Sequence, residues 1–308
     1  RLARAYRKRD KLLKFEGAYH GMHDHALMSA QWTMKVAEFP QAVPNSAGIT
    51  ASTKDDVLIA PFNDLEATLE IIRKHADELG CVMVEPLCRT FVPAPGFLEG
   101  LRDITRELDI PLVFDEVVTG FRLALGGAQE HYGVVPDLCA GAKAISGGLP
   151  SGFVAGRQDI MDLAGRAGMK VGNHVRLTGT YSGNVLSTSV ATALIRELKV
   201  PGVYDQVNAK GARLKQALEG LLSEAEIPAQ VLGEATAFQP WFLEGEVHDH
   251  RSSLGLNWKR QFKLQDLLLD RGILKGQEKF FVSTAHSDDD IDRTIAALAD
   301  LMDELKGE

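Results

Sequence analysis

Two apolar runs of the sequence end in acidic side chains, at positions where a buried strand would end. VFDEVVTGFR (113–122) carries Asp115 and Glu116, and the shorter run CVMVEP contains Glu85. A carboxylate at such a depth is costly unless a cation partners it. That partner could be a basic side chain, a metal ion, or the protonated nitrogen of a pyridine ring, which Asp115 would in turn keep protonated and electron-withdrawing.

A single lysine, Lys143, follows Asp115 by 28 residues. Most lysines are solvated surface charges. This one stands between the small, apolar CAGA and the glycine-rich AISGGLPSG, surroundings that we expect to favour a neutral amine able to attack an aldehyde. Glycines at 147, 148 and 152 would let the backbone pass close to a bound planar group. Each signal is weak alone, but together they indicate an amine and a carboxylate that serve one ligand.

The elements that must position these side chains alternate between strand and helix. Asn63 and Glu66 form a possible capping box, and apolar residues then recur at helical spacing over 65–79, up to Gly80. The strand CVMVEP, the helix GFLEGLRDITRELDI and the strand PLVFDE follow in turn. This order is typical of an α/β fold with a mostly parallel sheet flanked by helices, where ligands gather at the carboxyl ends of the strands.

A second region is predicted to begin near Pro201. Leucines and valines four apart over 184–200 indicate a long helix before it. VLGEATAFQPWFL is strand-like, and Ser287 is expected to cap a final helix that begins with three aspartates. We therefore expect a large domain over 1–200 and a smaller C-terminal α/β domain over 201–308.

Composition restricts the class of protein. The chain has 308 residues, a formal net charge of −8 and a sequence pI of about 5.6, which argues against a nucleic-acid or anionic-membrane partner. No apolar run approaches the roughly 18 residues of a membrane helix. The three cysteines form no CxxC pair and suggest no metal site, and a reducing cytoplasm is the default location. A doubly wound dehydrogenase or a P-loop kinase is disfavoured because GxGxxG and GxxxxGK[ST] are absent from the sequence.

The N-terminal segment RLARAYRKRD is strongly basic and starts with Arg1. A transit peptide or a nucleic-acid-binding arm would have such a composition. We favour the end of an amphipathic helix whose beginning lies upstream, because Leu2, Ala5 and Tyr6 have helical spacing and the strand-like KLLKFEG follows.

Several longer motifs, in this order, resemble one family. The sequence is similar to the class III aminotransferases, pyridoxal-phosphate enzymes of fold type I, and among them to the glutamate-1-semialdehyde aminomutase-like branch. The motifs that carry the resemblance are FEGAYHGMHD (15–24), APFNDLEA (60–67), VEPL and PAPGFLEGLRDIT (84–105), FDEVVTGFR (114–122), YGVVPDLCAGAKAISGG (132–148), GTYSGN (179–184) and STAHSDDDID (283–292).

The resemblance implies a role for each candidate site residue. Lys143 would form the Schiff base with pyridoxal phosphate and then carry the proton between substrate and cofactor. Asp115 would pair with the pyridine nitrogen. Tyr19 would stack on one face of the ring and Val117 would pack on the other. Glu85 would lie near the cofactor's 3-hydroxyl and the substrate. Without the resemblance, Tyr19 is an ordinary core tyrosine.

Two further residues have alternatives of equal weight. His20 would support the site, or would be a structural histidine. Thr180 would reach the phosphate of the neighbouring subunit's cofactor at a helix N-terminus, which implies a homodimer with shared active sites. Thr180 and Ser182 could equally be helix caps. The resemblance also implies a small-molecule amino donor and an oxo or semialdehyde acceptor as partners.

Two departures from the family pattern stand beside the resemblance. The family has a segment ahead of RLARAY that supplies most of the phosphate-binding cup, and we expect this chain to lack it. The segment LCRTFV (87–92) differs from the asparagine-bearing aminomutase pattern. Transaminase and aminomutase therefore both stay open, and a family member that binds cofactor weakly and is not catalytic is the alternative hypothesis.

Overall fold

The computed structural model describes residues 1–31 and 35–307. The chain forms two compact units, one of Arg1–Arg89 with Pro93–Leu198 and the other of Thr90–Val92 with Lys199–Glu308. Among the described residues, none of the helices combines the length and the apolar character needed to cross a membrane.

A six-stranded sheet forms the centre of the first unit, in the order β2-β1-β3-β4-β5-β6. Neighbours pair parallel from β2 through β5, and β6 pairs antiparallel with β5. The strands are β1 (Lys11–Phe15), β2 (Val57–Ala60), β3 (Leu79–Val84), β4 (Leu112–Glu116), β5 (Leu138–Ala142) and β6 (Gly152–Gly156). The predicted α/β class with a mostly parallel sheet is confirmed.

Helices cover both faces of this sheet because strand side chains alternate between the faces. On one face, Leu12 joins a buried cluster with Leu2 and Ile160 from two helices. On the other, Phe15 meets Phe97 edge to face, with ring centroids 5.6 Å apart. The helices are α1 (Leu2–Arg7), α2 (Ala51–Asp55), α3 (Leu65–Lys74), α4 (Phe97–Glu107), α5 (Gly127–Tyr132), α6 (Gln158–Met161), α7 (Arg166–Lys170) and α8 (Val185–Leu198), with short 3₁₀ turns η1 (Lys143–Ser146) and η2 (Asp162–Ala164).

The N-terminal cap of α3 differs from the prediction. The cap is Asp64, whose carboxylate accepts a hydrogen bond from the Ala67 amide at 3.0 Å. Asn63 instead has a left-handed backbone with φ of 67°, and its side chain accepts from the Ala94 amide at 2.8 Å. The predicted capping box at Asn63 was wrong because that side chain holds the distant loop before α4.

The end of α3 was also predicted too late. The helix ends at Lys74, whereas Leu79 and Gly80 belong to β3. Leu79 fits the helical spacing of α3 and also the apolar pattern of β3. Its parallel pairing with Lys11 of β1 places it in the sheet.

The helix α8 is present as predicted, but its apolar stripe is not buried. None of its residues is buried, and Val185 and Leu186 are 77% and 65% exposed. Tyr181, just before the helix, is 82% exposed. Apolar side chains therefore form part of the surface of the first unit here.

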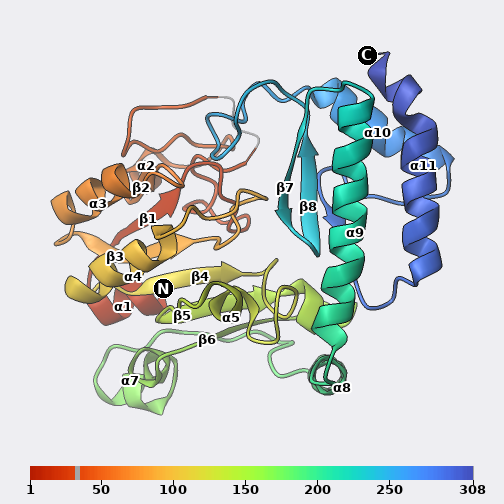
Figure 1. Ribbon diagram of the computed structural model, residues 1–308. Helices are drawn as coiled ribbons and strands as arrows, with labels where there is room; N and C mark the ends of the chain where they lie inside the picture. Colours follow the sequence, from red (N-terminus) through yellow and green to blue (C-terminus); the bar gives the residue numbers. More distant parts are fainter. Residues whose placement is uncertain (32–34, 308) are drawn as a thin grey trace. The chain divides into compact units, whose positions relative to one another are not determined.

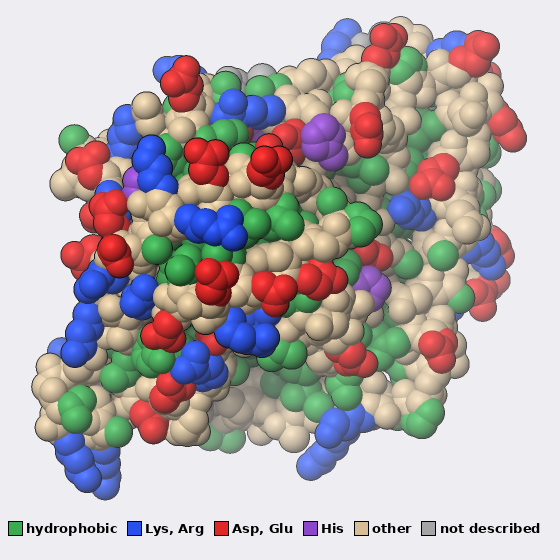
Figure 2. All heavy atoms as spheres, turned by 60° about the vertical axis from the view of Figure 1, so that its left-hand side comes forward, with side chains coloured by type: hydrophobic (Ala, Val, Ile, Leu, Met, Phe, Trp, Pro, Cys, Tyr) green, Lys and Arg blue, Asp and Glu red, His purple; other side chains and the backbone are tan. Residues whose placement is uncertain are grey.

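On the face shown in Figure 2, acidic and basic side chains are interspersed.

A lysine lies buried in the middle of β1. Lys14 is fully buried, and its Nζ donates hydrogen bonds to the carbonyl oxygens of Ala18, Ala26 and Met28 at 2.8, 3.1 and 2.7 Å. Burial lowers the pKa of Lys14 to about 8, although Glu85 nearby acts in the opposite direction. The Lys14 amine therefore fixes the loop that follows β1 through three hydrogen bonds. This loop carries Tyr19 and His20.

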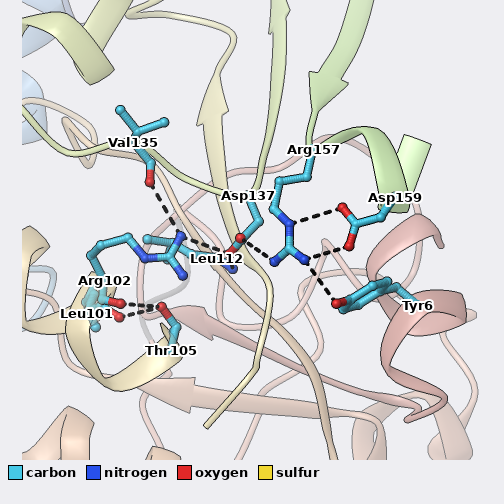
Figure 3. A network of polar contacts seen from close by, with 9 residues as sticks. All are labelled: Tyr6, Leu101, Arg102, Thr105, Leu112, Val135, Asp137, Arg157 and Asp159. Carbon is cyan, nitrogen blue, oxygen red and sulfur yellow. Dashed lines mark hydrogen bonds and ion pairs between the residues drawn. The ribbon is translucent and has the colours of Figure 1, made fainter. Parts of the chain in front are cut away.

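The starts of β4 and β5 are joined by the carboxylate of Asp137 (Figure 3). It accepts hydrogen bonds from the Leu112 amide at 2.8 Å, from Arg102 at 2.9 Å and from Arg157 at 3.0 Å. Burial tends to raise the pKa of Asp137, but the Leu112 amide and the two arginines outweigh it and hold the pKa below its usual range. Arg157 also donates to the Tyr6 hydroxyl at 3.0 Å. Two strands and three helical segments therefore share one ionic cluster.

The second unit has a small antiparallel sheet and three long helices. Its strands are β7 (Gln230–Glu234), β8 (Ala237–Trp241) and β9 (Phe280–Phe281), and its helices are α9 (Val203–Glu224), α10 (Trp258–Asp270) and α11 (Asp288–Lys306). The predicted cap of α11 is confirmed, since Ser287 and Asp290 form a reciprocal capping box. The strand-like VLGEATAFQPWFL contributes to two paired strands that turn between Glu234 and Ala237.

Stability should depend on pH through Lys14. Its pKa of about 8 in the folded chain lies below the ordinary value of 10.5, so between these pH values the unfolded chain binds more protons and stability rises with pH. We expect wild type to gain roughly 2–4 kcal/mol relative to Lys14→Met between pH 8 and 10.5. Urea unfolding of both proteins across this range measures the gain. Parallel stability curves would contradict the assignment.

Candidate active site

The candidate residues lie at the carboxyl ends of three adjacent parallel strands in the first unit's sheet. Asp115 in β4 pairs with Ala140 of β5, and Lys143 directly follows β5. Glu85 directly follows β3, the other neighbour of β4. Three adjacent strands thus bring the lysine and both acids to the same end of the sheet.

Asp115 has a histidine partner. Its Oδ2 lies 2.7 Å from His20 Nδ1, and its Oδ1 accepts from the Val117 amide at 3.1 Å. The side chains of His20 and Asp115 are only 3% and 11% exposed. Buried His20 Nε2 makes no hydrogen bond with any described residue. The internal pair expected as one alternative for Asp115 is therefore present, formed with His20.

A second contact joins the loop after β1 to β3. The backbone amide of Tyr19 donates to Glu85 Oε2 at 3.2 Å, and Glu85 is 9% exposed. Cys88 Sγ approaches the same oxygen at 3.9 Å. Tyr19, His20, Glu85, Asp115 and Val117 therefore form one connected group.

Lys143 differs from this group because it is exposed rather than enclosed. The structure shows no hydrogen bond or ion pair between its amine and any described residue. Its backbone is left-handed, with φ of 51°, a conformation that costs a non-glycine residue of order 1–3 kcal/mol. Such strain recurs at functional sites, and here it sits at the strand end that turns into η1.

The side chain of Glu116 points to the opposite face of β4 from that of Asp115, and both of its carboxylate oxygens accept hydrogen bonds. Its carboxylate accepts from Thr119 Oγ1 and the Ala128 amide, each at 2.7 Å, and from the amide and side chain of Gln129 at 3.2 and 3.0 Å. A Cβ on Gly127 would collide with this carboxylate. Glu116 thus fixes the turn after β4 to the start of α5.

Thr180 is not brought into this group by any contact of the described residues. It is exposed and lies in the turn before α8. Asn184 caps that helix, its Oδ1 accepting from the Ser187 amide at 3.1 Å. The alternative of Thr180 or Ser182 as the cap is replaced by Asn184.

The chemistry of the side chains fits a planar cationic ring with a carbonyl group. The two oxygens of Asp115 accept one hydrogen bond each from described residues, which leaves acceptor capacity for a ring N–H. The uncommitted amine of Lys143 suits a carbonyl carbon. Across residues 1–31 and 35–307, the structure brings no three His, Cys, Asp or Glu side chains together as a potential metal site.

Comparison with known proteins identifies the family. A family model described as "Aminotransferase class-III" matches residues 1–262. Glutamate-1-semialdehyde 2,1-aminomutase of Desulforudis audaxviator is 40% identical over 303 residues, with 96% of this chain and 68% of the relative covered. The fold and these matches define an enzyme class, the pyridoxal-phosphate-dependent transferases of fold type I. The chain belongs to the class III aminotransferase family.

Solved structures agree with this assignment. An omega-transaminase from Sphaerobacter thermophilus superposes with a TM-score of 0.91 at 32% identity, covering 99% of this chain and 71% of that one. A transaminase with PLP bound gives a TM-score of 0.88 at 26% identity, covering 99% and 70%.

Sequence reasoning missed the buried residues that support the site. Lys14 carried a signal, since a lysine inside the apolar run KLLKF needs acceptors if it is buried. Glu116 was noted beside Asp115, but its four donors lie in a turn and a short helix whose geometry no sequence pattern specifies.

Replacing Glu116 should destabilise the fold. In Glu116→Gln the amide NH₂ would face donors, so we expect the free energy of unfolding to fall by about 2–4 kcal/mol. Glu130→Gln is the matched control, because exposed Glu130 accepts only the Gly126 amide in the described structure, and a change below about 1 kcal/mol is expected there. Urea unfolding compares them. Equal losses would show that Glu116 is no special support.

Proposed function

We propose that the chain transfers amino groups with pyridoxal phosphate held at the carboxyl ends of β3, β4 and β5. Lys143 would hold the cofactor through its amine, and Asp115 would pair with the ring nitrogen. The observation that carries the proposal is the arrangement of two neighbouring strand ends, one with a buried, histidine-paired carboxylate and the other with a free amine. Membership of the class III family supports it.

The cofactor supplies a carbonyl carbon for the substrate amine and a ring that accepts electrons. Asp115, which contacts His20 at 2.7 Å, would hold a proton at the ring nitrogen. Lys143 would move the proton at the reacting substrate carbon. Tyr19 and Val117 would pack on the two faces of the ring, and Glu85, fixed by the Tyr19 amide, would lie toward the substrate.

The choice between aminomutase and transaminase rests on relatives of both kinds. The 40% identity to an aminomutase favours the aminomutase reaction, in which one semialdehyde serves as acceptor and donor. The structural likeness to an omega-transaminase favours transfer between two molecules. In either case the partners would be a small-molecule amino donor and an oxo or semialdehyde acceptor.

The remaining parts of the proposal concern assembly and location. We propose a cofactor-binding domain over 1–200, a smaller domain over 201–308, and a cytoplasmic homodimer with shared sites to which Thr180 contributes. The exposed apolar side chains at Tyr181, Val185 and Leu186 support a partner surface near Thr180. Neither a nucleic acid nor a membrane is proposed as a partner.

Chemical labelling tests the lysine. Purified protein mixed with pyridoxal phosphate and then reduced with borohydride should carry one pyridoxyl group on Lys143, located by peptide mass spectrometry. Lys143→Ala should lose the label and at least ~10²–10⁴-fold of the transfer rate. Lys54→Ala, a change at an exposed lysine of α2, is the control and should keep both.

Asp115→Asn should keep the label and lose rate, because the amide cannot hold the ring proton electrostatically. Label found on another lysine, or retained in Lys143→Ala, would refute the choice of Lys143. A wild-type protein without label would favour the alternative of a family member that does not hold the cofactor.

The acceptor requirement separates the two reactions. An aminomutase should convert glutamate-1-semialdehyde without any added oxo acid, since the amine returns to the same carbon skeleton. A transaminase should show turnover only when an amino donor and an oxo acid are both present. Chromatographic assay of the products with and without added oxo acid distinguishes them.

A further inference from the structure

A cavity of about 370 Å³ lies in the first unit at the end of the sheet opposite the candidate active site. Asp137, which lines it, directly precedes β5, whereas Lys143 directly follows that strand. Lys143 follows Asp137 by six residues, roughly 20 Å of strand at about 3.3 Å per residue. The cavity is therefore distinct from the site proposed for the cofactor.

Arg102 lines the cavity, and part of its guanidinium group makes no hydrogen bond with a described residue; Figure 3 shows the contacts that it does make. Arg102 is 9% exposed, and only its Nη1 is engaged, with Asp137 at 2.9 Å and the Val135 carbonyl at 3.4 Å. Its buried Nε makes no hydrogen bond with a described residue, and the structure shows none for Nη2. Because Nε has no accessible surface, Nη2 is the group of Arg102 that can donate to a carboxylate in the cavity.

Two further charged side chains of the cavity are also uncommitted. Arg106 lies one helical turn after Arg102 on α4, and Asp109 follows its end. Both are exposed, and neither side chain makes a hydrogen bond or ion pair with a described residue. Arg157 and Asp137 are already paired with each other.

The uncommitted charges therefore comprise guanidinium groups and one carboxylate. A simple dianion would gain from Arg102 and Arg106 but would be repelled by Asp109. A zwitterion would satisfy both signs. We propose that this cavity binds a small free amino acid, with its carboxylate on Arg102 and Arg106 and its ammonium group toward Asp109.

Titration calorimetry with cofactor-free protein tests the proposal, with L-glutamate as the probe and glutarate as its analogue without the ammonium group. We expect L-glutamate to bind and glutarate to bind about tenfold more weakly or not at all. Arg106→Ala should weaken L-glutamate binding about tenfold or more, and Arg106→Lys should restore it only in part. Asp109→Ala should remove the preference for L-glutamate over glutarate.

Two variants keep this site apart from the candidate active site. Lys143→Ala should bind L-glutamate as wild type does, and Arg73→Ala, at an exposed arginine on α3, should be unchanged as well. Binding that is lost in Lys143→Ala but retained in Arg106→Ala would assign the amino acid to the active site and overturn the proposal. No detectable binding at about 20 mM L-glutamate would overturn it too.

Discussion

The pairing of β4 with β5 is the constraint on which the candidate site depends, and a carboxylate at the start of β5 helps to fix it. A shift by one residue in a strand would turn every side chain to the opposite face. Asp137 accepts the first amide of β4 while it lies directly before β5, so the starts of both strands are tied to one group. Their far ends then present Asp115 and Lys143 together. Removing Asp137 would leave the buried Arg102 without its carboxylate partner, the costly case for such pairs.

Lys14 and Glu116 differ from the candidate site residues in how many hydrogen bonds their polar groups make. Lys14 and Glu116 are buried and make three and four hydrogen bonds. At the site, His20 Nε2 has no described partner and Lys143 has a strained backbone. Proteins break local rules mainly where function requires it. This contrast agrees with a rigid scaffold that holds a few unsatisfied groups ready for a ligand.

Much of the first unit could be predicted from the sequence because its signals are local. Apolar strands that end in acids, alternating with amphipathic helices, specified the parallel sheet and placed Asp115 and Glu85 at the carboxyl ends of its strands. The cap of α3 could not be chosen, since Asn63 and Asp64 are equally good caps and the choice depends on a contact with Ala94, 31 residues away. The His20–Asp115 pair spans 95 residues, and no spacing rule reaches that far. The exposure of α8 could not be predicted either, because an apolar stripe indicates a partner surface without saying whether this chain supplies the partner.

The adjacency of Asp115 and Glu116 has a consequence for genetics. Neighbouring strand residues point to opposite faces, so the two acids share no partner among the contacts described, and each can be altered while the other keeps its surroundings. Alleles at codon 116 would act through the abundance of folded protein, and, if Asp115 has the role proposed for it, alleles at codon 115 would act through the activity of each folded molecule. One dipeptide thus offers a separation-of-function pair for interpreting variation in living cells.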